Sequence, residues 1–159
     1  MKTQNLALLI IGGIIIAAIL LFYKMLDYIP LTEATPEYIK EVVVYKEGAD
    51  GLVVYFVLAD AQGAMVCSSG TATLIISDTS SNQKTVLYDE KYHLSKEHFH
   101  RATVGLGAFK RKVILCSFGR LTYSSFEKLP DEDSFGKVEV QFRREPDGRI
   151  LEGSDTIYF

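Results

Sequence analysis

The hydrophobic pattern divides the chain into two unlike parts, and the first is one apolar run. Residues 6–22 contain no charge and no proline over 17 positions. As a helix, this run is about 25 Å long, and Asn5 and Tyr23 extend it toward the ~30 Å hydrocarbon thickness of a bilayer. The pattern predicts one transmembrane helix over residues 5–23, within an N-terminal anchor at residues 1–26.

A cleaved signal peptide is the main alternative for this run. Such a peptide needs a shorter apolar stretch of ~7–15 residues and a small-x-small cleavage site, and no such triplet directly follows residue 22. The flanking charges, Lys2 before the run and Lys24 offset by Asp27 after it, favour a cytoplasmic N-terminus. We therefore expect a single-pass protein of the cell membrane with an extracytoplasmic C-terminal domain.

After the run, the pattern changes first to a linker and then to strands. Residues 27–37 carry Pro30, Pro36 and two threonines with little apolar periodicity, which is typical of a linker. From Tyr38 onward, short β-rich segments alternate with turn residues. The predicted strands cover residues 41–46, 52–59, 64–67, 71–78, 84–94, 111–118 and 137–142, with further strand material at 149–153 and 155–159.

These strands predict an all-β domain at residues 38–159. No helical pattern of 10–15 residues separates them, which favours an antiparallel two-sheet, immunoglobulin-like sandwich over a parallel sheet. Residues 52–59 (LVVYFVLA) are apolar at every position, as in a central strand covered on both faces. Alternation in the next strands places Ala72, Leu74 and Ile76 inward, together with Val86, Tyr88, Tyr92 and Leu94. In residues 137–142 the same alternation places Val138, Val140 and Phe142 on one face.

The layout resembles single-pass surface proteins of archaea and bacteria that carry immunoglobulin-like or fibronectin-III-like domains. The turns DAQG and EPDG and the stretch SFGRLTYSSFEK (117–128) also resemble an archaeal membrane-protein family. The resemblance implies a membrane-anchored sandwich and carries no functional residue with it. Two features depart from true immunoglobulin domains: tryptophan is absent, and Ile114 stands two residues before Cys116 where a tyrosine corner would require tyrosine.

Charge argues against nucleic acid as a partner. The region after Pro30 has a net charge of −4, from 15 basic and 19 acidic residues. Its one dense basic spot is KRK at Lys110–Lys112, which is typical of a solvated end of a strand. We therefore expect no nucleic acid partner.

Two sets of residues are the candidates for chemistry. All three histidines, His93, His98 and His100, lie within eight positions; two of them would share a face in a strand, whereas a helical turn capped by Ser95 would separate them and leave Phe99 for the core. Cys67 and Cys116 permit one disulfide in an oxidising compartment, but their unequal positions, at a turn and in mid-strand, favour two free thiols. The acidic DED at residues 131–133 is typical of a solvated turn.

No motif indicates a nucleophile, a phosphate loop or a paired metal site. The sequence therefore predicts a non-enzymatic module with no catalytic, cofactor or metal residues. Its expected partners are the membrane, through residues 5–23, and a protein or component of the cell envelope. A ligand- or metal-binding sensor that uses the His93–His100 segment is the alternative.

Overall fold

The fold is seen in a computed structural model that describes residues 15–16, 30–80, 84–105, 107–131 and 133–159. The chain forms two compact units, Met1–Pro30 and Leu31–Phe159. The predicted membrane helix at 5–23 lies outside the described residues, apart from Ile15 and Ile16. Within the described parts of the chain, no helix is long and apolar enough to cross a bilayer.

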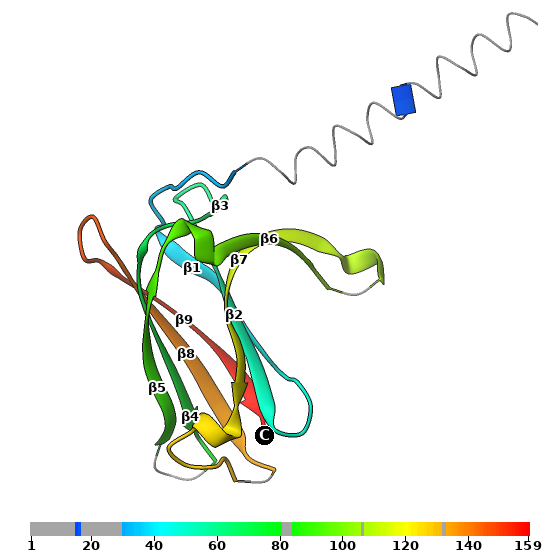
Figure 1. Ribbon diagram of the computed structural model, residues 1–159, viewed down its shortest axis with the longest axis vertical. Helices are drawn as coiled ribbons and strands as arrows, with labels where there is room; N and C mark the ends of the chain where they lie inside the picture. The colour runs from blue at the N-terminus through cyan, green and yellow to red at the C-terminus, as the bar shows by residue number, and fades with distance from the viewer. Residues whose placement is uncertain (1–14, 17–29, 81–83, 106, 132) are drawn as a thin grey trace, which may run out of the picture. The chain divides into compact units, whose positions relative to one another are not determined.

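Leu31–Phe159 is an all-β domain of two antiparallel sheets, which confirms the predicted class (Figure 1). One sheet has the order β1-β2-β7-β6, with β3 pairing with β2, and the other has the order β5-β4-β8-β9. The nine strands of the described residues are β1 (Tyr38–Lys46), β2 (Gly51–Ala59), β3 (Met65–Val66), β4 (Gly70–Asp78), β5 (Thr85–Leu94), β6 (Phe99–Val104), β7 (Arg111–Thr122), β8 (Phe135–Arg144) and β9 (Ile150–Tyr158).

Alternating apolar side chains from both sheets form the main core, as expected for a sandwich. In β2, every second residue is fully buried between the sheets, and the predicted inward residues of β4 and β8 are fully buried as well. Phe99 is also in this core, where its ring packs edge-on against Phe56 with centroids 6.0 Å apart. The inward residues of these three strands are Leu52, Val54, Phe56, Leu58, Ala72, Leu74, Ile76, Val138, Val140 and Phe142.

The predicted facing of β5 is wrong at its start. Leu87 is buried and Val86 is 40% exposed, the reverse of simple alternation. The register between β4 and β5 shifts between Ile76 and Ser77, and such a bulge places two residues of one strand opposite one of the other. Because the bulge breaks the two-residue period, the alternation resumes only from Tyr88, which is buried.

The two sheets meet where β1 passes β9. The backbone N–H of Val44 donates to Oδ2 of Asp155, 3.1 Å away. Gly153 makes this approach feasible, because a Cβ there would lie only 2.7 Å from Cγ2 of Ile39 and 2.9 Å from Cγ2 of Val42. Any larger residue at 153 would push the two edge strands apart.

Candidate interaction surfaces

The histidine segment forms a tight turn followed by a strand. Ser95 precedes a single 3-10 turn, η1 (Lys96–His98), and its N–H donates to Nδ1 of His98, 3.0 Å away. Nδ1 of His93 lies 3.4 Å from Oγ1 of Thr71, and His100 is exposed on β6. Among the described residues there is no group of three or more His, Cys, Asp or Glu side chains placed to hold a metal ion. The sensor alternative stays a prediction that this arrangement does not favour.

Both cysteines are buried free thiols, as the sequence favoured. Burial raises the pKa of the Cys116 thiol to about 12. Burial also raises the pKa of the Cys67 thiol, whose Sγ donates to the carbonyl of Thr32 at 3.3 Å. Because the thiolate is the reactive form of cysteine, these raised pKa values make both residues poor nucleophiles.

The second half of the predicted linker, Leu31–Glu37, packs against the sandwich, and we call it the strap. Its Ala34 N–H donates to the carbonyl of Cys67 at 3.1 Å, and its Glu37 N–H donates to the carbonyl of Ala59 at 2.8 Å. Pro36 is fully buried. The compact unit therefore begins at Leu31, seven residues before the expected start of the domain at Tyr38.

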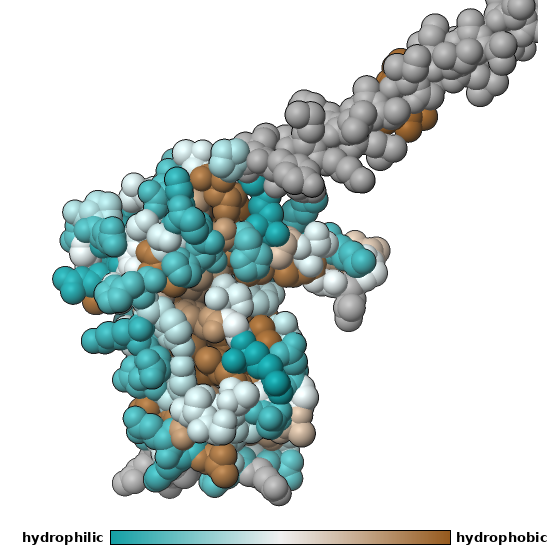
Figure 2. Space-filling model, viewed as in Figure 1, coloured by the Kyte–Doolittle hydropathy of each residue, from teal (hydrophilic) through white to brown (hydrophobic). Residues whose placement is uncertain are grey.

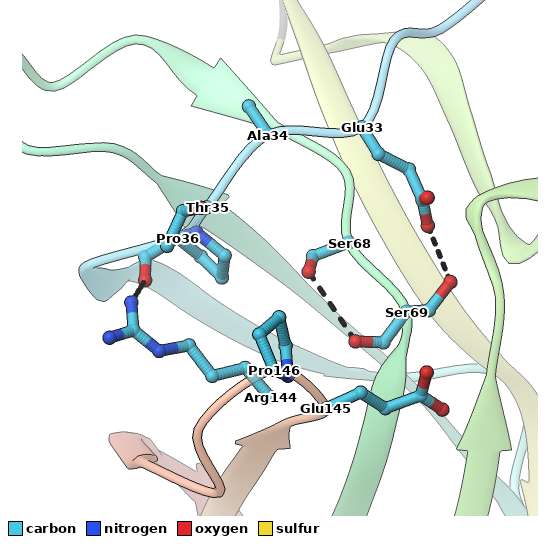
Figure 3. Close-up of a pocket in the computed structure, with 9 residues that line it drawn as sticks. All are labelled: Glu33, Ala34, Thr35, Pro36, Ser68, Ser69, Arg144, Glu145 and Pro146. Atoms are coloured by element: carbon cyan, nitrogen blue, oxygen red, sulfur yellow. Dashed lines mark hydrogen bonds between the residues drawn. The ribbon is translucent and has the colours of Figure 1, made fainter.

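A cavity of about 270 Å³ lies between the strap, Ser68, Ser69 and the turn after β8, and Arg144 lines it (Figure 3). Four hydrogen bonds hold the guanidinium of Arg144 there. Its Nη1 donates to the carbonyl of Pro36 at 2.5 Å and to Oε1 of Glu37 at 3.1 Å. Its Nε and Nη2 donate to the two carboxylate oxygens of Asp147 at 2.7 and 2.5 Å. Arg144 thus ties the strap to the β8–β9 turn and leaves little positive charge for a ligand.

The charges of this network stabilise one another. Hydrogen bonds from Arg144 hold the pKa of Asp147 down at about 2. Hydrogen bonds from Arg144 and Arg149 lower the pKa of Glu37, against the opposing effect of burial. Asp147 and Glu37 raise the pKa of Arg144 in turn. The strap is therefore held by carboxylates that stay charged over the ordinary pH range.

A hairpin arm extends beyond the first sheet at the same end of the domain as the strap (Figure 1). The arm consists of β6, the 3-10 turn η2 (Gly107–Phe109) and residues 111–115 of β7, which pair with β6 alone. Arg111 forms an ion pair with Glu41 of β1, with Nη2 2.5 Å from Oε2. This contact fastens the arm across the outer face of β2.

A second apolar cluster lies under the base of the arm, on the outer face of the sheet. Val57, Val113 and Leu115 are buried there. The half-buried side chains packed around them are Tyr55, Met65, Ala102 and Val104. This cluster covers the outer side of β2, which explains why residues 52–59 are apolar at every position.

The opposite end of the domain carries what we call the distal surface. It contains a depression of about 370 Å³ lined by Lys46, Ala49, Tyr123, Leu129, Pro130, Asp131, Asp133 and Phe159. The large apolar residues exposed at this end include Leu129 by 71%, Phe135 by 57% and Tyr158 by 49%. Figure 2 shows apolar side chains at the lower end of the view among hydrophilic ones.

Contacts between side chains order the distal surface. The rings of Phe135 and Tyr158 pack with centroids 5.0 Å apart, and Nζ of Lys46 lies 5.9 Å from the Tyr158 centroid. The Tyr158 hydroxyl donates to Oδ1 of Asp133 at 3.0 Å, and this bond raises the pKa of Tyr158. Asp133, from the acidic triplet, thus accepts a hydrogen bond from Tyr158. Residue 132 of the same triplet lies outside the described residues.

Sequence reasoning missed the distal surface. Its one local signal is the presence of large apolar residues, Leu129 and Phe135, in a stretch otherwise rich in proline and acidic residues. This stretch meets the C-terminal strand and the end of β1 only because the strands pair, as Phe135 does with Tyr158. Local sequence does not show such a pairing.

Comparison with known proteins identifies no family. Neither protein-family models nor curated protein sequences match the chain. Among solved structures, the chain is similar to the crystal structure of MtrC from Shewanella baltica OS185, with a TM-score of 0.42 and 12% identity. The similarity covers 76% of this chain and 21% of the other, so the chain spans about a fifth of that protein's length. The architecture described above rests on the strand pairing of this chain itself.

Proposed function

We propose that this protein is a non-enzymatic, single-pass membrane protein whose immunoglobulin-like sandwich presents its distal surface, outside the cytoplasm, to a protein or envelope partner. The observation that carries the proposal is exposed Leu129 in the lining of a depression at one end of the domain, together with the exposed pair Phe135 and Tyr158, which is joined to that lining through the bond from Tyr158 to Asp133. Exposed aromatic and apolar residues in a cluster with a polar rim are the usual composition of a protein interface.

The placement of this surface supports the same function. The strap enters the domain at one end, and the distal surface lies at the other (Figure 1). The strap, through which the chain enters the domain, therefore does not cover the distal surface. Loops at the end of a rigid sandwich are a common location for binding residues.

The anchor is tested on membranes that contain the full chain. We expect alkaline carbonate washing to leave the chain in the membrane pellet, because a spanning helix is released only by detergent. A chain that lacks residues 1–30 should be recovered in the soluble fraction with β-type circular dichroism. Release of the full chain by carbonate would contradict the anchor.

The distal surface is tested by photo-crosslinking in the native membrane. A photoreactive amino acid replaces Leu129, and a matched variant carries it at Ile150, which is 54% exposed but lies at the strap end. We expect a discrete crosslinked partner from position 129 and none from position 150. Equal crosslinking from both positions, or none from 129, would refute the role of this surface.

A further inference from the structure

The arm is amphipathic, with apolar residues on one face and basic residues on the other. Side chains alternate along a strand, and the pair Ala102 with Val113 faces the cluster over β2. The neighbouring residues Arg101, Thr103 and Lys112 therefore lie on the other face, together with half-buried Ile114 at the base of the arm, and the first three are exposed. The arm thus carries exposed basic side chains on this face, although the chain as a whole has a net charge of −3.

The tip of the arm carries the most exposed large apolar residue of the described chain. Phe109 is 87% exposed and is followed directly by Lys110. Gly105 has φ +99°, and a Cβ there would lie 2.5 Å from the carbonyl oxygen of Phe109. The backbone of the tip therefore closes tightly against Gly105, and the Phe109 side chain is left exposed.

The basic residues of the arm lie at the strap end of the domain. Met65 of β3 packs in the cluster under the arm, with Ala102 and Val104, and Cys67 follows two residues later. Cys67 in turn accepts a hydrogen bond from Ala34 of the strap. The arm therefore starts beside the point at which the chain enters the domain.

The length of the chain before the strap limits how far this end can move from a bilayer. Seven residues lie between Tyr23, at the end of the apolar run, and Leu31, so that eight Cα-to-Cα steps join the two. Fully extended, they span at most about 29 Å. If the run is anchored as proposed, the arm is held within reach of the headgroups of the same membrane.

We propose that the arm docks on the surface of that membrane, with Phe109 inserted among the headgroups and Arg101, Lys110 and Lys112 against lipid phosphates. An aromatic side chain flanked by basic residues suits the interface between water and hydrocarbon. The acidic groups near the arm among the described residues include Glu41, which is paired with Arg111, together with Glu33 and exposed Glu97. Arg101 and Lys112 also have partners within the chain, which lipid phosphates would join or replace. This inference rests on the proposed anchor, and it would orient the distal surface away from the bilayer.

The absence of tryptophan from the chain gives a direct test. The full chain with Phe109→Trp is reconstituted as single copies in nanodiscs of phosphatidylcholine, with or without phosphatidylglycerol. We expect the emission of the introduced tryptophan to shift to shorter wavelength in the anionic discs and to be quenched by brominated acyl chains. The matched reporter Leu129→Trp, at the distal surface, should show neither effect.

The basic residues are tested in the same discs. Each basic residue near an anionic surface strengthens binding about fivefold, so adding Lys110→Gln and Lys112→Gln to the Phe109→Trp chain should weaken docking of the arm roughly thirtyfold. Both residues are exposed, and an unchanged circular dichroism spectrum would show that the fold is kept. High salt should weaken docking in the same direction.

The outcomes separate this inference from the proposed function. A Phe109→Trp chain that inserts into the discs without any change in the emission of its tryptophan would overturn the docking and leave the anchor intact. A chain that does not insert would overturn both. An emission shift that occurs only when several copies share one disc would assign the arm to a second copy of the chain and overturn docking on lipid.

Discussion

The two ends of the domain each contain an arginine with two carboxylate partners, but the two sites differ in burial. Arg144, at the strap end, has an 8% exposed side chain and binds Glu37 and Asp147. Arg120, at the distal end, has a 45% exposed side chain and binds Asp50 and Glu47. The same ion-pair chemistry therefore holds the strap in place at one end, whereas at the other end it lies on the exposed surface of the turn between β1 and β2.

This difference shows how one domain can hold the entering chain in place at one end and leave apolar side chains exposed for binding at the other. The strap end uses its buried charges and Pro36 to secure the entering chain, whereas the distal end leaves Leu129, Phe135 and Tyr158 exposed. Large exposed apolar residues contribute little to folding. We attribute structural importance to the first end and recognition to the second.

The comparison is tested most strongly by replacing each arginine with methionine. Arg144→Met leaves Asp147 without its ion-pair partner, leaves Glu37 with Arg149 alone and removes the hydrogen bond to the carbonyl of buried Pro36. We expect the thermal midpoint to fall by roughly 10 °C. Arg120→Met removes exposed ion pairs, and we expect it to change the thermal midpoint by no more than about 2 °C. Differential scanning calorimetry of both variants decides the point, and equal shifts would refute the distinction.

A second test removes the strap-end charges by acid. Asp147 has a lowered pKa of about 2 in the folded protein and an ordinary value near ~3.9 when unfolded. A carboxyl group whose pKa is lower in the folded protein than in the unfolded chain stabilises the folded state at pH values above the unfolded pKa. This stabilisation is lost as the pH falls through the folded pKa. The urea midpoint of the wild type should therefore exceed that of Asp147→Asn above about pH 4, and the gap should close toward pH 2. A gap independent of pH would show that Asp147 acts through packing.

A third test compares two glycines of opposite surroundings. Gly105 at the arm tip and Gly119 in the distal half of β7 both have positive φ, but only Gly105 faces a close neighbour. Gly119→Ala should lower the free energy of unfolding by about 1–2 kcal/mol, because alanine disfavours the left-handed backbone conformation. Gly105→Ala should cost roughly 1–3 kcal/mol more, because its Cβ meets the Phe109 carbonyl. Urea unfolding measures both, and equal costs would indicate that the arm tip relaxes freely.

The smallest effect on stability is expected at the distal surface. Leu129→Ser should change the free energy of unfolding by less than about 0.5 kcal/mol, since the side chain is exposed. If this residue lies at the centre of the interface, binding of the crosslinked partner should weaken roughly tenfold. A loss of stability without a loss of binding would show that Leu129 belongs to the fold and not to the interface.

The interaction surfaces were only partly visible in the sequence. The basic residues Lys110–Lys112 stood out, but as the solvated end of a strand, because nothing local shows that β6 and β7 continue past the sheet. The strap had the composition of a linker, since its Pro36 and Glu37 meet Arg144 only across more than 100 residues of chain. The exposed aromatic pair of the distal surface likewise brings together Phe135, at the start of β8, and Tyr158, at the end of β9.

The sequence by itself determined the all-β class, most strand positions and the inward faces of β4 and β8, because a two-residue apolar period is a local property that burial between two sheets requires. The docking of the strap, the bulge that reverses the start of β5, the amphipathic arm and the distal surface were decided by tertiary structure. Each depends on which distant residues become neighbours, as Glu41 and Arg111 do across 70 positions. Local periodicity contains no information about such pairs.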